Sequence, residues 1–339
     1  MTKHETGPSI NDAQRPSLPA GGNRLRKMKE TAEAKKLEAA DDAAGQAGRV
    51  VGAPKRPIVR YHGGKWKLSG WIASHFPPHR VYVEPFGGGA SVLLRKPRSY
   101  AEIYNDMDGE IVNVFRVMRN RGEELRRLLE LTPFSRIEFI ESYELSADPL
   151  EQARRTILRS FQGFGSASVC GETSGFRSNS NRSGTTPAHD WRNYPGNIPD
   201  FVERLRGVVI EQRDAVEVML RHDGPDTLHY VDPPYVHSTR GGKTRGSVTR
   251  KTYKHEMDDA AHRELSGILH EMRGTVVLSG YRCSLYDEMY SDWRRVDRAA
   301  HADGAKDRIE SLWLSRQPIQ ADIWGANAVL SGAKHGDKP

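Results

Sequence analysis

The sequence predicts an α/β fold in which a wound, mostly parallel β-sheet is covered by helices on both faces. Short apolar segments typical of buried strands alternate along the chain with amphipathic segments of helical period. Several strand segments end in an acidic residue, and one ends in two consecutive prolines, which cannot continue a sheet ladder. Ligands bind at the carboxyl ends of the strands in such sheets, so these ends are where we expect the functional residues.

The predicted elements begin near residue 60. A glycine turn and an amphipathic helix occupy 60–76, with one apolar helical face formed by Leu68, Trp71, Ile72 and Phe76. Further strands, most of them followed by a helix, are predicted within 80–94, 100–118, 207–220 and 227–235. The segment 258–272 is an amphipathic helix that leads into a buried-type strand at 274–281. Residues 308–315 follow an Asp303–Gly304 turn and are expected to close an antiparallel hairpin at the sheet edge.

These patterns divide the chain into four parts. Residues 1–56 are rich in Ala, Gly, Lys, Glu and Pro, contain no Phe, Trp or Tyr, and are expected to form a disordered or partly helical tail. The sheet domain comprises 57–120 together with 207–316. Between them, 121–206 holds two helical stretches and a long polar loop, which is typical of an inserted, functional segment. Residues 317–339 form a second tail.

Composition excludes several classes of protein. The chain has 339 residues, of which 37% are hydrophobic and 28% charged, and it contains no apolar run of about 18 residues that would span a membrane. The amino terminus has no apolar stretch of the signal-peptide type. The two cysteines, Cys170 and Cys283, form no CxxC pair, and the 13 histidines show no HExxH spacing. We therefore expect no membrane association, no disulfide framework and no bound metal, in a protein of the cytoplasm.

The net charge of +7 suits a nucleic-acid partner, although residues 1–56 alone account for +4 of it. Local clusters are more informative. The loop from 163 to 197 mixes aromatic residues with cations, a combination suited to base stacking and phosphate contact; it contains Phe164, Phe176, Trp191 and Tyr194 with Arg177, Arg182 and Arg192. The segment 237–257 is glycine-punctuated and basic, and could clamp DNA phosphates through Arg240, Lys243, Arg245, Arg250 and Lys251. Solvated surface loops are the alternative interpretation of both.

A glycine turn separates a strand from a helix at 83–91. Its three glycines, Gly87 to Gly89, would let the backbone approach a ligand closely at a helix amino terminus. Neither the GxGxxG spacing of a dinucleotide site nor the GK[ST] of a phosphate-binding loop is present. Asp106 ends the next strand, 18 residues beyond Gly88, where it could bind ribose hydroxyls or cap the helix that starts near Asp108. Together these features indicate a site for a nucleoside-containing cofactor that lacks a pyrophosphate-binding motif.

Three stretches, in this order, resemble the Dam-type family of DNA adenine-N6 methyltransferases. They are YHGGKWKL at 61–68, VEPFGGGASV at 83–92 and VDPPY at 231–235. The similarity extends through 104–119 and, more loosely, 258–314, so that it covers most of 57–316 with a diverged middle segment. This resemblance implies the Rossmann-like fold of enzymes that use S-adenosyl-L-methionine (SAM), and it makes 121–206 the DNA target-recognition segment.

The resemblance also assigns site residues. Those matching the family's cofactor-binding positions are Tyr61, Lys65, Glu84, Phe86, Gly87, Gly88, Gly89, Asp106, Asp214 and Asp232. The residues matching its catalytic tetrad are Asp232, Pro233, Pro234 and Tyr235. The family usually reads F-x-G-x-G in the glycine turn, whereas this chain carries Ala90 in the last place; this departure bears on the local turn geometry and not on the cofactor.

The tetrad suits the chemistry of an exocyclic amine. Its nitrogen is a poor nucleophile, because its lone pair is delocalised into the ring. The Asp232 carboxylate and the Pro233 carbonyl could accept its two hydrogens and direct the lone pair at the methyl donor, while Tyr235 stacks on a base that has left the duplex. No metal and no covalent enzyme intermediate is required.

The expected function is methyl transfer from SAM to N6 of adenine in double-stranded DNA. The same geometry would serve cytosine N4 or RNA, and a catalytically inactive DNA-binding relative is a further alternative. An NAD-type oxidoreductase is disfavoured by the missing GxGxxG. A prokaryotic or phage-encoded enzyme, with or without a cognate restriction endonuclease, fits these motifs.

Overall fold

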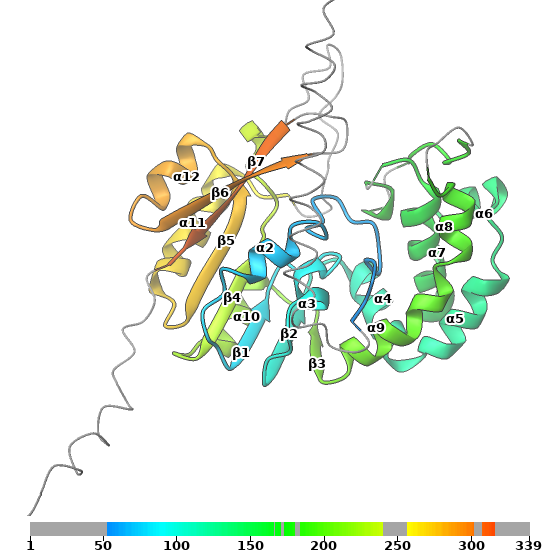
Figure 1. The fold of residues 1–339 in the computed structure, drawn as a ribbon, viewed down its shortest axis with the longest axis horizontal. Helices are drawn as coiled ribbons and strands as arrows, with labels where there is room; N and C mark the ends of the chain where they lie inside the picture. Colours follow the sequence, from blue (N-terminus) through cyan, green and yellow to red (C-terminus); the bar gives the residue numbers. More distant parts are fainter. Residues whose placement is uncertain are drawn as a thin grey trace, which may run out of the picture. The chain divides into compact units, whose positions relative to one another are not determined.

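The computed structural model describes residues 53–165, 167–170, 173–179, 184–239, 256–301 and 307–315, all within one compact unit, Arg49–Pro339. The described residues form a seven-stranded sheet in the order β3-β2-β1-β4-β5-β7-β6 (Figure 1). The strands are β1 (Val81–Glu84), β2 (Ala101–Asn105), β3 (Val208–Glu211), β4 (Thr227–Val231), β5 (Thr275–Tyr281), β6 (Arg294–His301) and β7 (Asp307–Leu314).

The strand order places a switch point at the centre of the sheet. From β1 the chain moves outward to β2 and β3, and then returns to the other side of β1 as β4, followed by β5. All of these pairs are parallel, whereas β7 runs antiparallel to both β5 and β6. The predicted mostly parallel sheet with an antiparallel carboxyl-terminal hairpin is therefore confirmed. In such a sheet the crevice for a ligand opens between the carboxyl ends of β1 and β4.

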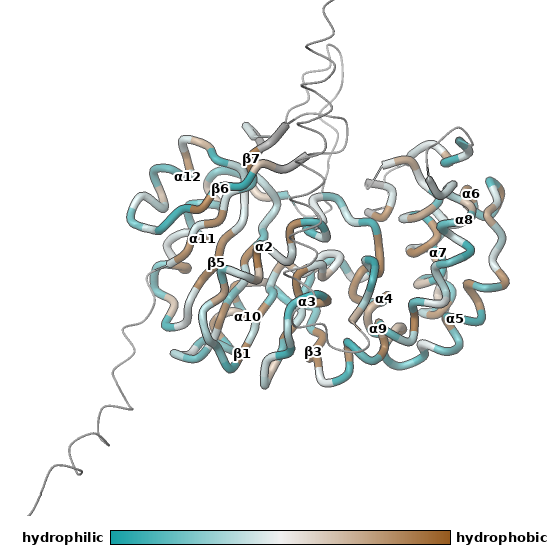
Figure 2. Tube along the Cα trace, in the orientation of Figure 1, coloured by the Kyte–Doolittle hydropathy of each residue, from teal (hydrophilic) through white to brown (hydrophobic). Residues whose placement is uncertain are grey.

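Successive side chains of a strand point to opposite faces of the sheet, and here both faces are buried against helices. Tyr82, Tyr104 and Tyr230 face a core that they share with α2 (Ser69–Ala73), α3 (Ser91–Arg95) and α4 (Gly109–Asn120). Val83 and Val231, on the opposite face, pack in cores supplied by α10 (Ala215–His222), α11 (Asp259–Glu271) and α12 (Ser284–Met289). Figure 2 shows that hydrophobic residues recur along both the strands and the helices. Helices on both faces are what the sequence predicts for a parallel sheet.

The segment between α4 and β3 is helical. It contains α5 (Gly122–Leu131), α6 (Arg136–Glu141), α7 (Pro149–Gln162), α8 (Pro187–Arg192) and α9 (Ile198–Leu205). Helices α5 and α7 correspond to the two predicted stretches, but α8 lies within residues interpreted as a loop. Its start is encoded locally, because Thr186 caps the helix by accepting a hydrogen bond from the backbone N–H of His189 (3.3 Å), and Pro187 occupies the first turn.

Helix α7 is attached to α4 through a buried ion pair. Arg159, only 1% exposed, donates to the Glu110 carboxylate of α4 and to the carbonyl of Ser142 (2.9 Å). Gln152 adds a hydrogen bond to the same Glu110 oxygen at 3.0 Å. This contact joins the inserted helices to a helix that covers the sheet.

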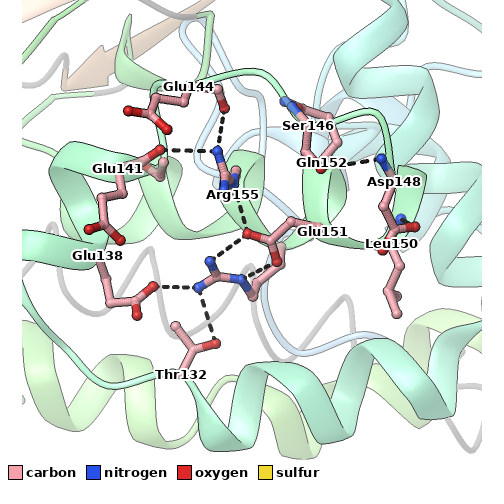
Figure 3. Close-up of polar contacts among 12 residues, drawn as sticks. Thr132, Glu138, Glu141, Glu144, Ser146, Asp148, Leu150, Glu151, Gln152 and Arg155 are labelled. Atoms are coloured by element: carbon pink, nitrogen blue, oxygen red, sulfur yellow. Dashed lines mark hydrogen bonds and ion pairs between the residues drawn. The ribbon is translucent and has the colours of Figure 1, made fainter.

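A second polar network joins α7 to α6 (Figure 3). Arg154 binds Glu151 on its own helix and Glu138 on α6, each at 2.7 Å. Arg155 also binds Glu151 and donates to the carbonyl groups of Glu141 and Glu144 at the end of α6. The inserted helices are thus linked to one another as well as to α4.

Candidate active site

A cavity of about 560 Å³ opens at the carboxyl ends of β1 to β4 and is bounded by α11 on one side. Its volume lies within the range usual for small-molecule sites. The predicted cofactor-binding residues all line it: Tyr61, Lys65, Glu84, Phe86, Gly87, Gly88, Gly89, Asp106, Asp214 and Asp232. Pro233 and Pro234 line it as well. The fold therefore brings together predicted site residues that are up to 173 positions apart in the chain.

The glycine turn after β1 is packed too tightly for side chains. A Cβ atom on Gly87 would lie 2.2 Å from the Tyr104 ring, and Gly88 has a positive φ of 46° with the Tyr61 ring beside it. The Tyr104 hydroxyl donates to the Gly88 carbonyl at 2.8 Å. Glycine is required at these two positions because the supporting rings already occupy the space a side chain would need.

Ala90 has a backbone conformation that is usual for glycine. Its φ of 51° and ψ of 35° lie in the left-handed region, at the amino-terminal boundary of α3. This conformation costs an L-residue about 1 kcal/mol or more, which explains why glycine is usual there. Ala90 thus adopts a backbone conformation that favours glycine in spite of its methyl group.

Asp106 and Asp108 have different roles. Asp108 caps α4, with its carboxylate accepting from the backbone N–H of Glu110 at 3.0 Å. Asp106 instead bridges two loops, since its carboxylate accepts from the backbone N–H groups of Gly88 and Asp108, both at 2.8 Å. Helix capping is thus the function of Asp108, and Asp106 is a partly exposed carboxylate in the cavity wall.

Asp214 follows β3 and caps α10. Its Oδ1 atom accepts from the backbone N–H groups of Val216 at 2.9 Å and Glu217 at 3.2 Å. The residue is exposed and lines the cavity. Asp214 therefore combines a capping role, which the sequence interpretation did not include, with a place in the predicted cofactor site.

Glu84, at the end of β1, is a buried acid in the cavity wall. It accepts hydrogen bonds from the Tyr82 hydroxyl at 2.7 Å and from the Leu93 backbone N–H at 3.0 Å. Burial raises the pKa of its carboxyl to about 8; the two hydrogen bonds and Lys96 oppose this rise, and the charge of Asp232 adds to it. At neutral pH the Glu84 carboxyl is therefore largely protonated.

Asp232 follows β4 directly and is held by two side chains. The Lys65 ammonium lies 2.8 Å from each oxygen of its carboxylate, and the Ser279 hydroxyl donates to Oδ1 at 2.7 Å. Lys65 is only 5% exposed, whereas the Asp232 side chain is 19% exposed. The carboxylate is thus fixed in position and still accessible from the cavity.

Tyr235 is almost entirely buried beside this ion pair. Its hydroxyl donates to the Glu310 carboxylate, and its ring meets the edge of Tyr281 at a centroid distance of 4.6 Å. The Lys65 ammonium lies 4.6 Å from the centre of the same ring. Of the four predicted catalytic residues, Tyr235 is the one that is absent from the cavity wall.

Three polar residues of the site were missed from the sequence. Asn105 is fully buried and ties the loops after β1 and β3 together, by donating to the carbonyls of Pro85 and Arg213 and accepting from the Arg213 backbone N–H. Ser279 and Glu310 support Asp232 and Tyr235. The sequence feature that could have identified them is a polar residue within a predicted strand. Such a residue indicates a buried hydrogen bond, but the sequence does not tell which residue is its partner.

The predicted DNA-binding arginines are only partly described. Arg192 is exposed on α8, whereas Arg177 is half-buried and donates to the Phe161 carbonyl at 3.2 Å. The remaining predicted contacts lie outside the described residues: Arg182, Arg240, Lys243, Arg245, Arg250 and Lys251.

The aromatic residues of the recognition loop divide into two groups. Trp191 and Tyr194 are buried in the hydrophobic core, and Phe176 packs against Phe134 at a centroid distance of 5.0 Å. Phe164 is 76% exposed. Among these four rings, therefore, only Phe164 has a face available for stacking, and the interpretation of all four as a stacking surface is corrected.

The described part of the chain carries no sign of a metal centre or of a membrane span. No group of three or more His, Cys, Asp or Glu side chains there is arranged to hold a metal ion. Within the same residues, no helix has the length and apolar character needed to cross a bilayer.

Residues 61–302 match the family of D12 class N6 adenine-specific DNA methyltransferases, and the chain belongs to this family. It is similar to the DNA adenine methylase of Escherichia coli strain K12, with 24% identity over 279 residues that cover 78% of this chain and 96% of that protein. The DNA adenine methylase of Escherichia coli O157:H7 gives the same values. The protein is thus an adenine-specific DNA methyltransferase, and the family decides between the adenine and cytosine alternatives.

Proposed function

We propose that this enzyme uses SAM bound in the cavity at the switch point, and that Asp232, Pro233 and Tyr235 hold the target adenine for site-specific methylation of double-stranded DNA. The observation that carries this proposal is the position of the Asp232 carboxylate. It lies in the wall of the same cavity as the glycine turn, Asp106 and Asp214. A methyl donor and its acceptor amine could therefore meet at one end of the cavity.

The residues of the cavity fit SAM chemically. Asp106 offers a carboxylate suited to ribose hydroxyls, and Asp214 lies at the end of the adjacent strand β3, where the adenine of the cofactor is expected. The acids of the wall favour a cationic ligand. When bound, SAM would supply an electrophilic methyl group on a positively charged sulfur atom.

The protein's own contribution is to hold the amine. Asp232 and the Pro233 carbonyl would accept the two N6 hydrogens, which localises the nitrogen lone pair for attack. Lys65 and Ser279 support this geometry by restricting the carboxylate before the base arrives. The adenine must first leave the base stack, because its amine is inaccessible to such a cavity within a duplex.

The inserted helices and the basic segment after the tetrad would bind the DNA. We infer that Arg177, Arg182 and Arg192, with the basic residues of 240–251, contact phosphates, and that Phe164 stacks on a base. The exposure of Arg192 and Phe164 supports this assignment. We also infer that the enzyme acts in the cytoplasm of a prokaryotic cell, on its own or beside a restriction endonuclease.

Incubation with labelled SAM and unmethylated duplex DNA, followed by digestion to nucleosides, tests the proposal. Label on N6-methyladenine is expected from the wild type, and a loss of at least about 100-fold from Asp232→Asn and Asp232→Ala. Asp292→Ala is the matched control, because Asp292 is an exposed acid that lies just before β6. If Asp232→Asn retained most of the wild-type rate while binding SAM normally, the assigned role of Asp232 would be wrong.

A further inference from the structure

Glu310 is a buried acid at the edge of the active site. It lies on β7, which runs antiparallel to β5, so that the beginning of β7 meets the carboxyl end of β5. The register pairs Glu310 with Tyr281, two residues beyond Ser279. The hairpin thus delivers an acidic side chain, only 3% exposed, to the edge of the sheet where Asp232 and Tyr235 lie.

The neighbours of Glu310 are residues of the catalytic centre. Its carboxylate accepts from the Tyr235 hydroxyl, and its Oε1 atom lies 3.8 Å from the Lys65 ammonium. A buried carboxylate is unfavourable unless charges and hydrogen bonds compensate for its desolvation. Glu102 is an acid of the same 3% exposure whose desolvation is compensated by two cations. Its carboxylate oxygens lie 2.6 Å from nitrogen atoms of Lys96 and Arg204. Glu310, by contrast, lies near the cation that holds Asp232.

From this arrangement we propose that Glu310 is a positioning residue for methyl transfer, an inference that rests on the proposed function. Its first effect is on Tyr235. The hydroxyl bond fixes the rotation of the ring, with Tyr281 against its side at 4.6 Å. A phenylalanine in this place would keep the ring but lose the bond that orients it.

The second effect concerns Lys65. Its ammonium lies 2.8 Å from both oxygens of Asp232. An adenine amine that donates to Asp232 competes with this ammonium for the lone pairs of the carboxylate. Because Glu310 lies 3.8 Å from the same ammonium, Lys65 can turn toward it without losing a counter-charge. Glu310 thus lowers the barrier to freeing Asp232 for the substrate.

A double-mutant cycle tests this proposal with Glu310→Gln and Tyr235→Phe. Glutamine keeps the size of the side chain and removes the charge. The single-turnover rate of methyl transfer at saturating SAM and DNA is expected to fall roughly 10- to 100-fold in Glu310→Gln, with the SAM dissociation constant changed less than about twofold. Tyr235→Phe is expected to lose rate by a similar factor. The double variant should be slower than the wild type by much less than the product of the two single losses, because both changes remove the same bond.

Glu102→Gln is the matched control, since it neutralises an equally buried acid away from the site. It is expected to lower stability and leave the single-turnover rate within about twofold of wild type. Full additivity in the cycle, or a wild-type rate in Glu310→Gln, would overturn the proposal. If Glu310→Gln does not fold, the single variant Tyr235→Phe tests the proposal by itself. A wild-type rate of methyl transfer in Tyr235→Phe would then overturn the proposal. Absence of labelled N6-methyladenine from the wild type would instead refute the proposed function itself.

Discussion

Glu84 shows how strongly one residue of the site depends on its surroundings. The carboxyl lies in the cavity wall, buried, with two hydrogen-bond donors and the charge of Asp232 nearby. Its donors favour the ionised form, but desolvation outweighs them. The free protein therefore holds a proton at this position that a cationic ligand would tend to displace.

This protonation makes stability depend on pH. The pKa of Glu84 is about 8 in the folded protein against 4.5 in the unfolded chain, so between these values only the folded state retains the proton. The contribution of Glu84 to the free energy of unfolding should therefore fall as pH rises from about 4.5 to 8, and then level off. We expect Glu84→Gln, which resembles the protonated acid, to remove this component. Urea denaturation at several pH values measures the difference between the two proteins.

The control is Glu141→Gln, which changes an exposed glutamate on α6. Its free energy of unfolding should follow the wild-type pH profile. If the profiles of Glu84→Gln and the wild type ran parallel from pH 5 to 8, Glu84 would not be the group that retains the proton.

At the scale of elements, the contact between α4 and α7 fixes the inserted helices. Arg159 and Glu110 form an ion pair in which the arginine side chain is 2% exposed and the glutamate 20% exposed. Removing one partner of such a pair leaves the other charge poorly compensated, which is more destabilising than replacing both. The attachment of α7 therefore depends on both residues together.

We expect Arg159→Met to lower the free energy of unfolding by about 3 kcal/mol, and the double change Arg159→Met with Glu110→Gln to lower it by less. Arg155→Met is the control, because its guanidinium binds α6 on a more exposed side of α7 and should cost about 1 kcal/mol or less (Figure 3). Chemical denaturation measures all three. A double variant less stable than Arg159→Met would contradict the ion-pair argument.

The sequence predicted most elements of the sheet because each carries its own local signal. The apolar strand before Asp232 and the two prolines after it mark the end of β4 without any knowledge of the fold. Helix α8 was missed because its six residues lie in polar sequence, although Thr186 and Pro187 mark its start. Glu310 could not be predicted as a neighbour of Tyr235, because their contact depends on the register between β5 and β7.

The whole molecule has to bind a polyanion with a modest excess of positive charge. Of the net charge of +7, only about +3 belongs to residues after 56, so DNA binding depends on where the cations lie more than on their number. The described part of the recognition segment offers Arg192 as an exposed cation and Phe164 as an exposed ring. These two residues should contribute to binding in different ways.

Salt dependence separates the two contributions. Arg192→Ala should weaken DNA binding and reduce the slope of log affinity against log salt by about one, as expected for a lost phosphate contact. Phe164→Ala should weaken binding by about 1–3 kcal/mol and leave that slope unchanged, because stacking releases no counterions.

Arg221→Ala is the control: this exposed arginine lies in the last turn of α10, far along the chain from the recognition segment. Titration of labelled duplex at several salt concentrations, with SAM affinity measured in parallel, gives both quantities. A loss of SAM affinity as large as that of DNA affinity in Arg192→Ala would mean that the substitution disturbs the fold, and that α8 is not a DNA-binding element.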